Sequence, residues 1–166
     1  MKTLTILRHA KSSWSNVSLS DAERPLNRRG ERDAPRMGKR MADAGVRPAL
    51  IVSSPAVRAW TTARIVAEQI NYPLEFLEKD ASLYLASLEG LLDVIVAQDN
   101  SVNSLMIVGH NPGLTSLANF FSPGLTDNLP TCGIVTVSMD TDSWDLYTPP
   151  KASLDYYDYP KKLPGF

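Results

Sequence analysis

Short apolar runs alternate with longer amphipathic segments along most of this chain. Three runs rich in Ile, Leu and Val have the composition of strands buried on both faces, and a fourth at Leu74–Leu77 is weaker. The three strong runs are Thr3–Leu7, Ala49–Val52 and Leu105–Val108. Helical spacing is found in three segments, which are Arg28–Ala44, Ala56–Ile70 and Leu88–Ala97. This alternation predicts an α/β fold with a mainly parallel sheet and helices on both faces.

The residues at the ends of these segments predict where the helices start and stop. Ser54-Pro55 and Asn111-Pro112 each offer a capping side chain followed by proline, so each predicts a helix start. Gly45 and Asn71 are stop signals. Pro35 conflicts with the first helix because proline removes a backbone donor there, so that helix either is kinked or starts later.

The C-terminal part of the chain has a different pattern. Ile134–Met139 and Trp144–Tyr147 alternate apolar and polar residues around a polar turn, which predicts a hairpin at an edge of the sheet. Residues 151–166 have no clear period, so we expect a tail that is partly disordered or lies along the surface. We therefore predict one catalytic domain over residues 1–150, followed by this tail.

Composition and net charge limit the kinds of partner and site that we expect for this protein. A length of 166 residues with 43% hydrophobic residues suits one domain with a proper core, and the formal net charge of −1 favours neither nucleic acid nor an anionic membrane. Cys132 is the only cysteine, which excludes an internal disulfide and zinc sites built from several thiolates. No apolar run is long enough to span a bilayer or to form a signal peptide core. We expect a cytoplasmic protein with neither nucleic acid nor a membrane as partner.

One basic stripe could indicate a different partner. Arginines recur every four residues in the first predicted helix, at Arg28, Arg32, Arg36 and Arg40. Such a stripe could bind nucleic acid or an acidic protein. Glu31 and Asp33 interrupt it, so we interpret it as a solvated helix face.

The candidate chemistry lies at the carboxyl ends of the predicted strands, where parallel sheets bind their ligands. Arg8 and His9 directly follow the first strand, His110 follows the third, and Arg58 lies one turn into the helix after the second. Guanidinium groups bind phosphate oxygens in pairs, and a helix N-terminus adds backbone donors. The sequence therefore predicts a site for a phosphoryl group.

The same strand ends indicate how this site acts. A metal-dependent phosphatase needs acidic ligands, and none directly follows Arg8, Ser53 or Gly109, so we expect neither a metal nor a cofactor. The nucleophile is then a side chain. Histidine has an ordinary pKa of about 6.5, so much of it is neutral at pH 7. We predict that His9 attacks phosphorus and forms a covalent intermediate.

Four motifs together resemble the histidine phosphatase superfamily, which includes phosphoglycerate mutases. They are LRHAKSSW, RPLNRRG, SSPAVRAWTTA and VGHNP, and the resemblance covers Met1 to about Pro150. It is greatest to the small branch of SixA-type phosphohistidine phosphatases. The resemblance implies a three-layer α/β/α sandwich and catalysis without metal. It also implies that His9 is phosphorylated and that Arg8, Arg58 and His110 bind the phosphoryl group.

This chain departs from the family pattern where many members carry a glutamate that protonates the leaving alcohol. Tyr84 aligns at that place, in the stretch SLYLASLEG. Loss of such an acid costs a factor on the order of 10² to 10⁴ on an ordinary ester, whereas a protonated phosphohistidine ring leaves with less help. The departure therefore favours phosphohistidine as substrate. Glu89, Asp21 and Asp80 stay open as alternative acids, and so does the absence of an acid.

Other residues near these motifs are candidates for contacts with the substrate. They are Ser12, Asn16, Arg24, Tyr84 and Glu89. Trp14 and Trp60 are expected to pack against other residues, and Cys132 to be structural. The expected partner is a protein that carries phosphohistidine, or else a small phosphate ester. Two alternatives to a phosphohistidine phosphatase remain, namely a phosphatase of small phosphate monoesters and a module that binds phosphorylated ligands without turnover.

Overall fold

The computed structural model describes residues 1–162, and within them six strands form one sheet in the order β3-β2-β4-β1-β5-β6. The strands are β1 (Lys2–Arg8), β2 (Leu50–Ser53), β3 (Glu78–Lys79), β4 (Ser104–Gly109), β5 (Ile134–Met139) and β6 (Ala152–Asp158). Strands β3, β2, β4 and β1 are parallel, and β5 and β6 complete the sheet by antiparallel pairing. The mainly parallel sheet is confirmed.

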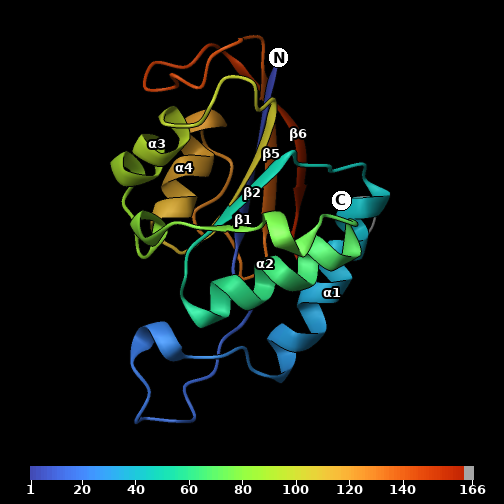
Figure 1. The fold of residues 1–166 in the computed structure, drawn as a ribbon, viewed down its shortest axis with the longest axis vertical. Coiled ribbons are helices and arrows are strands. Elements are labelled where there is room, and N and C mark those ends of the chain that lie inside the picture. The colour runs from blue at the N-terminus through green and yellow to red at the C-terminus, as the bar shows by residue number, and fades with distance from the viewer. Residues whose placement is uncertain (163–166) are drawn as a thin grey trace.

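Helices cover both faces of this sheet (Figure 1). On one face lie α1 (Arg28–Asp43) and α2 (Val57–Gln69), and on the other lie α3 (Leu88–Val96) and α4 (Gly113–Phe121). Each face has its own apolar core, and β1 supplies both, since Leu4 and Ile6 belong to one core and Leu7 to the other. Alternate side chains of a strand point to opposite faces. The molecule is therefore the three-layer α/β/α sandwich that the family resemblance implied.

The helices begin at slightly different residues from those predicted. Helix α1 starts at Arg28, where Asn27 caps it by accepting from the Gly30 amide, and it continues through Pro35, so it does not start later. Helix α2 starts only at Val57, and Ser54 is not its N-cap. The Ser54 hydroxyl instead lies 2.7 Å from Nε2 of His110, and it also accepts from the Ala56 amide at 3.3 Å.

Two predicted strands are wrong. The segment predicted as a strand at Leu74–Leu77 forms a 3₁₀ helix over Leu74–Phe76, and the edge strand β3 follows it. The edge hairpin exists, but the second strand is β6 and not Trp144–Tyr147. Residues 152–158 of the predicted tail are thus part of the sheet, while 163–166 lie outside the described residues. The alternating pattern around Trp144 was misleading because this residue is fully buried although it belongs to no strand. Its indole N–H donates to the Val102 carbonyl.

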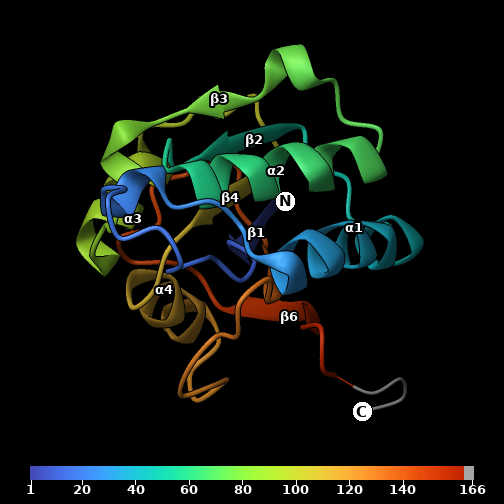
Figure 2. The same ribbon diagram turned by 90° about the horizontal axis from the view of Figure 1, so that it is seen from below.

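The parallel strands β1, β2 and β4 end at one edge of the sheet, and the segment 10–27 runs across that edge (Figure 2). Gly30 allows helix α1 to approach this segment closely, since a Cβ there would lie 2.1 Å from the Lys11 carbonyl oxygen. Next to it, the Asn27 amide donates to the same carbonyl at 3.0 Å. The start of α1 therefore fixes the chain directly after His9.

Candidate functional site

The two histidines come together because β1 and β4 are neighbours in the sheet. Their register pairs Arg8 with Gly109, so His9 and His110 leave the sheet side by side. The His9 amide donates to the Gly109 carbonyl at 3.1 Å, and the two ring centroids lie 5.3 Å apart. Parallel pairing thus brings together two residues that are 101 positions apart.

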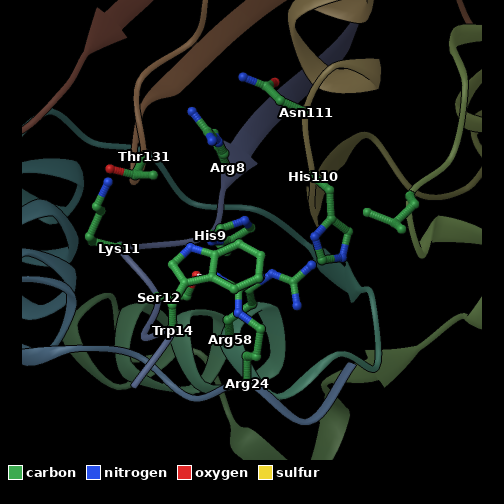
Figure 3. Close-up of a pocket in the computed structure, with 11 residues that line it drawn as sticks. Arg8, His9, Lys11, Ser12, Trp14, Arg24, Arg58, His110, Asn111 and Thr131 are labelled. Carbon is green, nitrogen blue, oxygen red and sulfur yellow. The ribbon is translucent and has the colours of Figure 1, made fainter. Parts of the chain in front are cut away.

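A cavity of about 180 Å³ opens in front of these rings (Figure 3). Its lining contains the four residues predicted to bind and transfer the phosphoryl group, and within residues 1–162 it contains no carboxylate. The lining consists of Arg8, His9, Lys11, Ser12, Trp14, Arg24, Arg58, Leu85, His110, Asn111 and Thr131. Such a surface suits an anion of the size of a phosphoryl group.

The surroundings of His9 define its protonation and its tautomer. Nδ1 lies 2.7 Å from the carbonyl oxygen of Ala10, which can only accept, so Nδ1 carries the hydrogen. Burial and, to a smaller extent, the nearby His110, Arg58 and Arg8 lower the pKa of His9 to about 3, against the opposing effect of the Ala10 hydrogen bond. At pH 7 the ring is therefore neutral, with its lone pair on Nε2.

His110 and Arg8, which both line the cavity, each have one buried side-chain nitrogen without a hydrogen-bond partner among the described residues. His110 Nε2 lies 2.7 Å from the Ser54 hydroxyl, and burial lowers its pKa to about 4. Arg8 donates from Nη1 to the Leu129 carbonyl at 2.8 Å. Among residues 1–162, neither Nδ1 of His110 nor Nε of Arg8 has a hydrogen-bond partner, although both atoms are buried. A buried polar atom without a partner is costly, and a bound ligand would remove that cost.

Asp21 holds the second arginine of the site. Arg58 donates to the Asp21 carbonyl oxygen at 2.6 Å and to its carboxylate at 2.9 Å. The same carboxylate accepts from Arg24 at 2.9 Å and from the Tyr84 hydroxyl. These contacts, the Tyr84 hydrogen bond first, lower the pKa of Asp21 far below its usual range, and the Asp21 carboxylate raises the pKa of Tyr84. Asp21 is therefore ionised at pH 7, and the Tyr84 proton points to Asp21.

The structure brings some of the other candidates to the cavity and leaves others outside. Ser12 and Arg24 line it, and the Arg24 guanidinium donates to the Ser12 hydroxyl. Asn16 is exposed and its side chain accepts from Ser18, while Glu89 is exposed on α3, so neither lines the cavity. Trp14 was expected to pack against other residues; the Arg24 guanidinium does lie over its ring, but 74% of Trp14 is exposed and it lines the cavity.

Sequence reasoning missed several residues of the site. Lys11, Leu85, Asn111 and Thr131 line the cavity, and of these Lys11 and Asn111 lie within the motifs LRHAKSSW and VGHNP, which could have indicated them. Thr62 supports the site from α2, where its hydroxyl accepts from the Ala10 amide at 2.9 Å and donates to the Arg58 carbonyl at 2.7 Å. Thr62 lies within the motif SSPAVRAWTTA, but nothing in the motif indicated these hydrogen bonds.

The family model of the histidine phosphatase superfamily (branch 1) matches residues 4–101 of this chain. The chain belongs to this superfamily. An uncharacterized chloroplastic protein of Arabidopsis thaliana is 32% identical over 155 residues, which cover 87% of this chain and 69% of that protein. A 2,3-bisphosphoglycerate-dependent phosphoglycerate mutase of Thermobifida fusca is 38% identical over 71 residues, which cover 42% of this chain and 29% of the mutase.

Solved structures place this histidine phosphatase in the SixA-type branch. A protein of Agrobacterium tumefaciens assigned as the phosphohistidine phosphatase SixA superposes with a TM-score of 0.81 at 27% identity, covering 96% of this chain and 98% of that chain. The protein histidine phosphatase SixA bound to tungstate has the same fold, with a TM-score of 0.78 at 23% identity and coverage of 95% and 97%. The recognition of the family and its branch is confirmed.

Two further features of this histidine phosphatase concern metals and membranes. Within residues 1–162, no three side chains of His, Cys, Asp or Glu lie together in an arrangement that could hold a metal ion. None of the helices in the described part of the chain is long and apolar enough to cross a membrane. Cys132 is fully buried, and burial raises the pKa of its thiol to about 12.

Proposed function

We propose that this protein is a phosphatase that uses His9 as a covalent nucleophile and acts on phosphohistidine in a protein, without a metal. One observation carries the proposal. The neutral imidazole of His9, with Nδ1 held by Ala10, lies in a cationic cavity whose lining has no carboxylate among the described residues. A nucleophile is thus available, and a general acid is not.

In the first step, the lone pair of His9 Nε2 forms a bond to phosphorus as the P–N bond of the substrate breaks. The electron pair of that bond returns to the substrate ring, which leaves as neutral imidazole because its other nitrogen already carries a hydrogen. The phosphorylated ring of His9 is cationic, and the Ala10 carbonyl that accepts from Nδ1 stabilises it. Arg8, Arg58 and His110 bind the phosphoryl oxygens as charge moves over them.

In the second step, water attacks phosphorus and the bond between phosphorus and Nε2 breaks, which returns the lone pair to His9. The products are inorganic phosphate and the original enzyme, and the proton of the water leaves with phosphate or to solvent. The same three residues bind the phosphoryl oxygens in both steps, so one cavity serves the whole cycle.

The choice of phosphohistidine rests on the leaving group. An alkoxide needs a proton, and the candidate acids do not supply one here, because Asp21 is ionised and neither Glu89 nor Asp80 lines the cavity. Tyr84 donates its proton to Asp21. An imidazole leaves without such help. The likeness to the Agrobacterium SixA structure supports this choice.

The test is phosphate release in the presence of EDTA. We expect faster release from a phosphohistidine-bearing carrier protein than from p-nitrophenyl phosphate or 3-phosphoglycerate. Efficient turnover of 3-phosphoglycerate with none on the carrier protein would overturn the proposal in favour of a small-molecule phosphatase. Trapping an acid-labile phosphoenzyme separates both from a module that only binds phosphorylated ligands, because such a module forms no covalent bond.

A further inference from the structure

Two apolar side chains at the cavity are exposed, although the rest of its lining is polar apart from the stems of the basic residues. Trp14 is 74% exposed and Leu85 is 54% exposed. They come from separate segments, Trp14 from the loop after β1 and Leu85 from the loop before α3. Both residues line the cavity, so each exposes apolar surface to water there; Figure 3 shows Trp14 in this position.

Trp14 is held in this place by Arg24. The guanidinium carbon of Arg24 lies 3.2 Å from the centroid of the indole ring, so it covers one face of the ring. Arg24 is itself fixed by three other hydrogen bonds, to the Ser13 carbonyl at 3.0 Å, to the Asp21 carboxylate at 2.9 Å and to the Ser12 hydroxyl. The indole ring therefore packs against a guanidinium group that hydrogen bonds hold in place, and much of the remaining surface of the ring faces solvent.

Leu85 is also held in place. Its φ of +50° is in the left-handed region, which is unfavourable for a leucine and is kept only where neighbouring structure imposes it. Here the neighbour is the start of α4. Gly113 lies so close to Ala86 that a Cβ on Gly113 would be 2.0 Å from the Ala86 carbonyl oxygen. This packing fixes the loop and keeps the Leu85 side chain exposed at the cavity.

We propose that Trp14 and Leu85 form an apolar rim that binds the planar ring carrying the phosphoryl group. This inference rests on the proposed function, since the ring is then the imidazole of phosphohistidine. With phosphorus against His9, the leaving group lies on the solvent side of the cavity, where the rim is. A flat ring stacks on an indole. A sugar or glycerate would bring hydroxyl groups against a surface with few polar partners.

The test uses ligands that bind without reacting. Phenylphosphonate carries a ring on a phosphoryl group, and methylphosphonate carries the same group without the ring. By calorimetry we expect wild type to bind phenylphosphonate about five- to tenfold more tightly, the order of a single aromatic contact. Trp14→Ala and Leu85→Ala should each reduce this ratio, and the double variant should bring it to about one.

Val17→Ala is the matched control, because Val17 is 95% exposed on the same loop but does not line the cavity, so the ratio should not change. Trp14→Phe keeps an aromatic plane and should retain most of the ratio. The proposal of the rim is overturned if wild type binds phenylphosphonate and methylphosphonate equally tightly. It is also overturned if the double variant keeps the same ratio of the two affinities as wild type. These ligands need no turnover, so failure of the rim is separate from failure of the proposed function, which the carrier-protein assay alone decides.

Discussion

A basic residue lies at each end of β1, the buried Lys2 at the start and the half-buried Arg8 at the end, and their hydrogen bonds differ. At the first end, Lys2 is 1% exposed. Its ammonium donates to the Val102 carbonyl at 2.9 Å, to the Asn103 side chain at 3.0 Å and to the Asn100 carbonyl. All three of its hydrogens have protein acceptors. The hydrogen-bond donors of the Lys2 ammonium are therefore all satisfied without a ligand.

At the other end of the same strand, some side-chain nitrogen atoms of the basic groups lack a hydrogen-bond partner. Nε of Arg8, and Nδ1 of His110 at the adjacent end of the neighbouring strand β4, are buried and have no partner among residues 1–162. Each such atom costs about 1–3 kcal/mol in the ligand-free protein. Burial alone therefore does not distinguish a structural basic group from a functional one. The two ends differ in how many buried side-chain nitrogen atoms lack a hydrogen-bond partner.

The largest expected effect is on catalysis at the Arg8 end of β1. His9→Ala removes the nucleophile but keeps the cationic cavity, so phosphate release should fall by a factor on the order of 10⁴ or more. Binding of tungstate, measured by calorimetry, should persist. Turnover close to that of wild type would contradict covalent catalysis by His9.

The next effect concerns pH. Both histidines of the chain lie in the site, and burial lowers the pKa of His9 to about 3 and of His110 to about 4. Below pH 6.5 the unfolded chain takes up protons that the folded protein does not, so stability falls as the pH falls. From pH 7 to pH 5 the loss should be roughly 2–4 kcal/mol.

Urea unfolding at both pH values measures this loss. A variant with both His9→Asn and His110→Asn has no histidine, so most of the pH dependence between pH 7 and pH 5 should disappear. If the double variant retains the full dependence, the two rings do not titrate as their burial implies.

A smaller effect is expected at the Lys2 end of β1. Lys2→Met keeps the length of the side chain but leaves its acceptors without a donor, which should lower the free energy of unfolding by about 2 kcal/mol. The rate of phosphate release should not change. Lys39→Met, at an exposed position of α1, is the control and should change neither quantity. A loss of activity without a loss of stability would show that Lys2 is not a purely structural residue.

The smallest effect concerns the residue that holds Arg58. Asp21→Asn keeps the shape of the side chain but weakens its bonds to Arg58 and Arg24, so kcat should fall about tenfold through misplacement of the guanidinium. Phosphate binding should not weaken, because a negative charge near the site is lost. Glu23→Gln is the control, since Glu23 lies on the same short 3₁₀ helix and bonds only to Ser20. An unchanged kcat would show that Asp21 does not position Arg58.

Local patterns in the sequence predicted most of the sheet and its helices, and failed where distant contacts decide the structure. Trp144 and Leu146 alternate with polar residues as in a strand, yet they are buried against the core without strand pairing. The real partner of β5 has mostly exposed or half-buried side chains, so its hydrophobic pattern was weak. Leu74–Leu77 was ambiguous for a related reason, since short apolar runs do not distinguish a strand from a helical turn.

The order of apolar runs and motifs in the sequence was enough to predict that Arg8, His9, Arg58 and His110 follow parallel strands, whose ends share one edge of the sheet. The folded structure was needed to show which ring nitrogen of His9 is free, that Asp21 binds Arg58, and that Trp14 packs on Arg24 while it is largely exposed. These properties depend on hydrogen bonds and packing, and several of those contacts join residues far apart in the chain. The hydrophobic period reports which face of an element is buried, but it does not report which polar atoms meet across the fold.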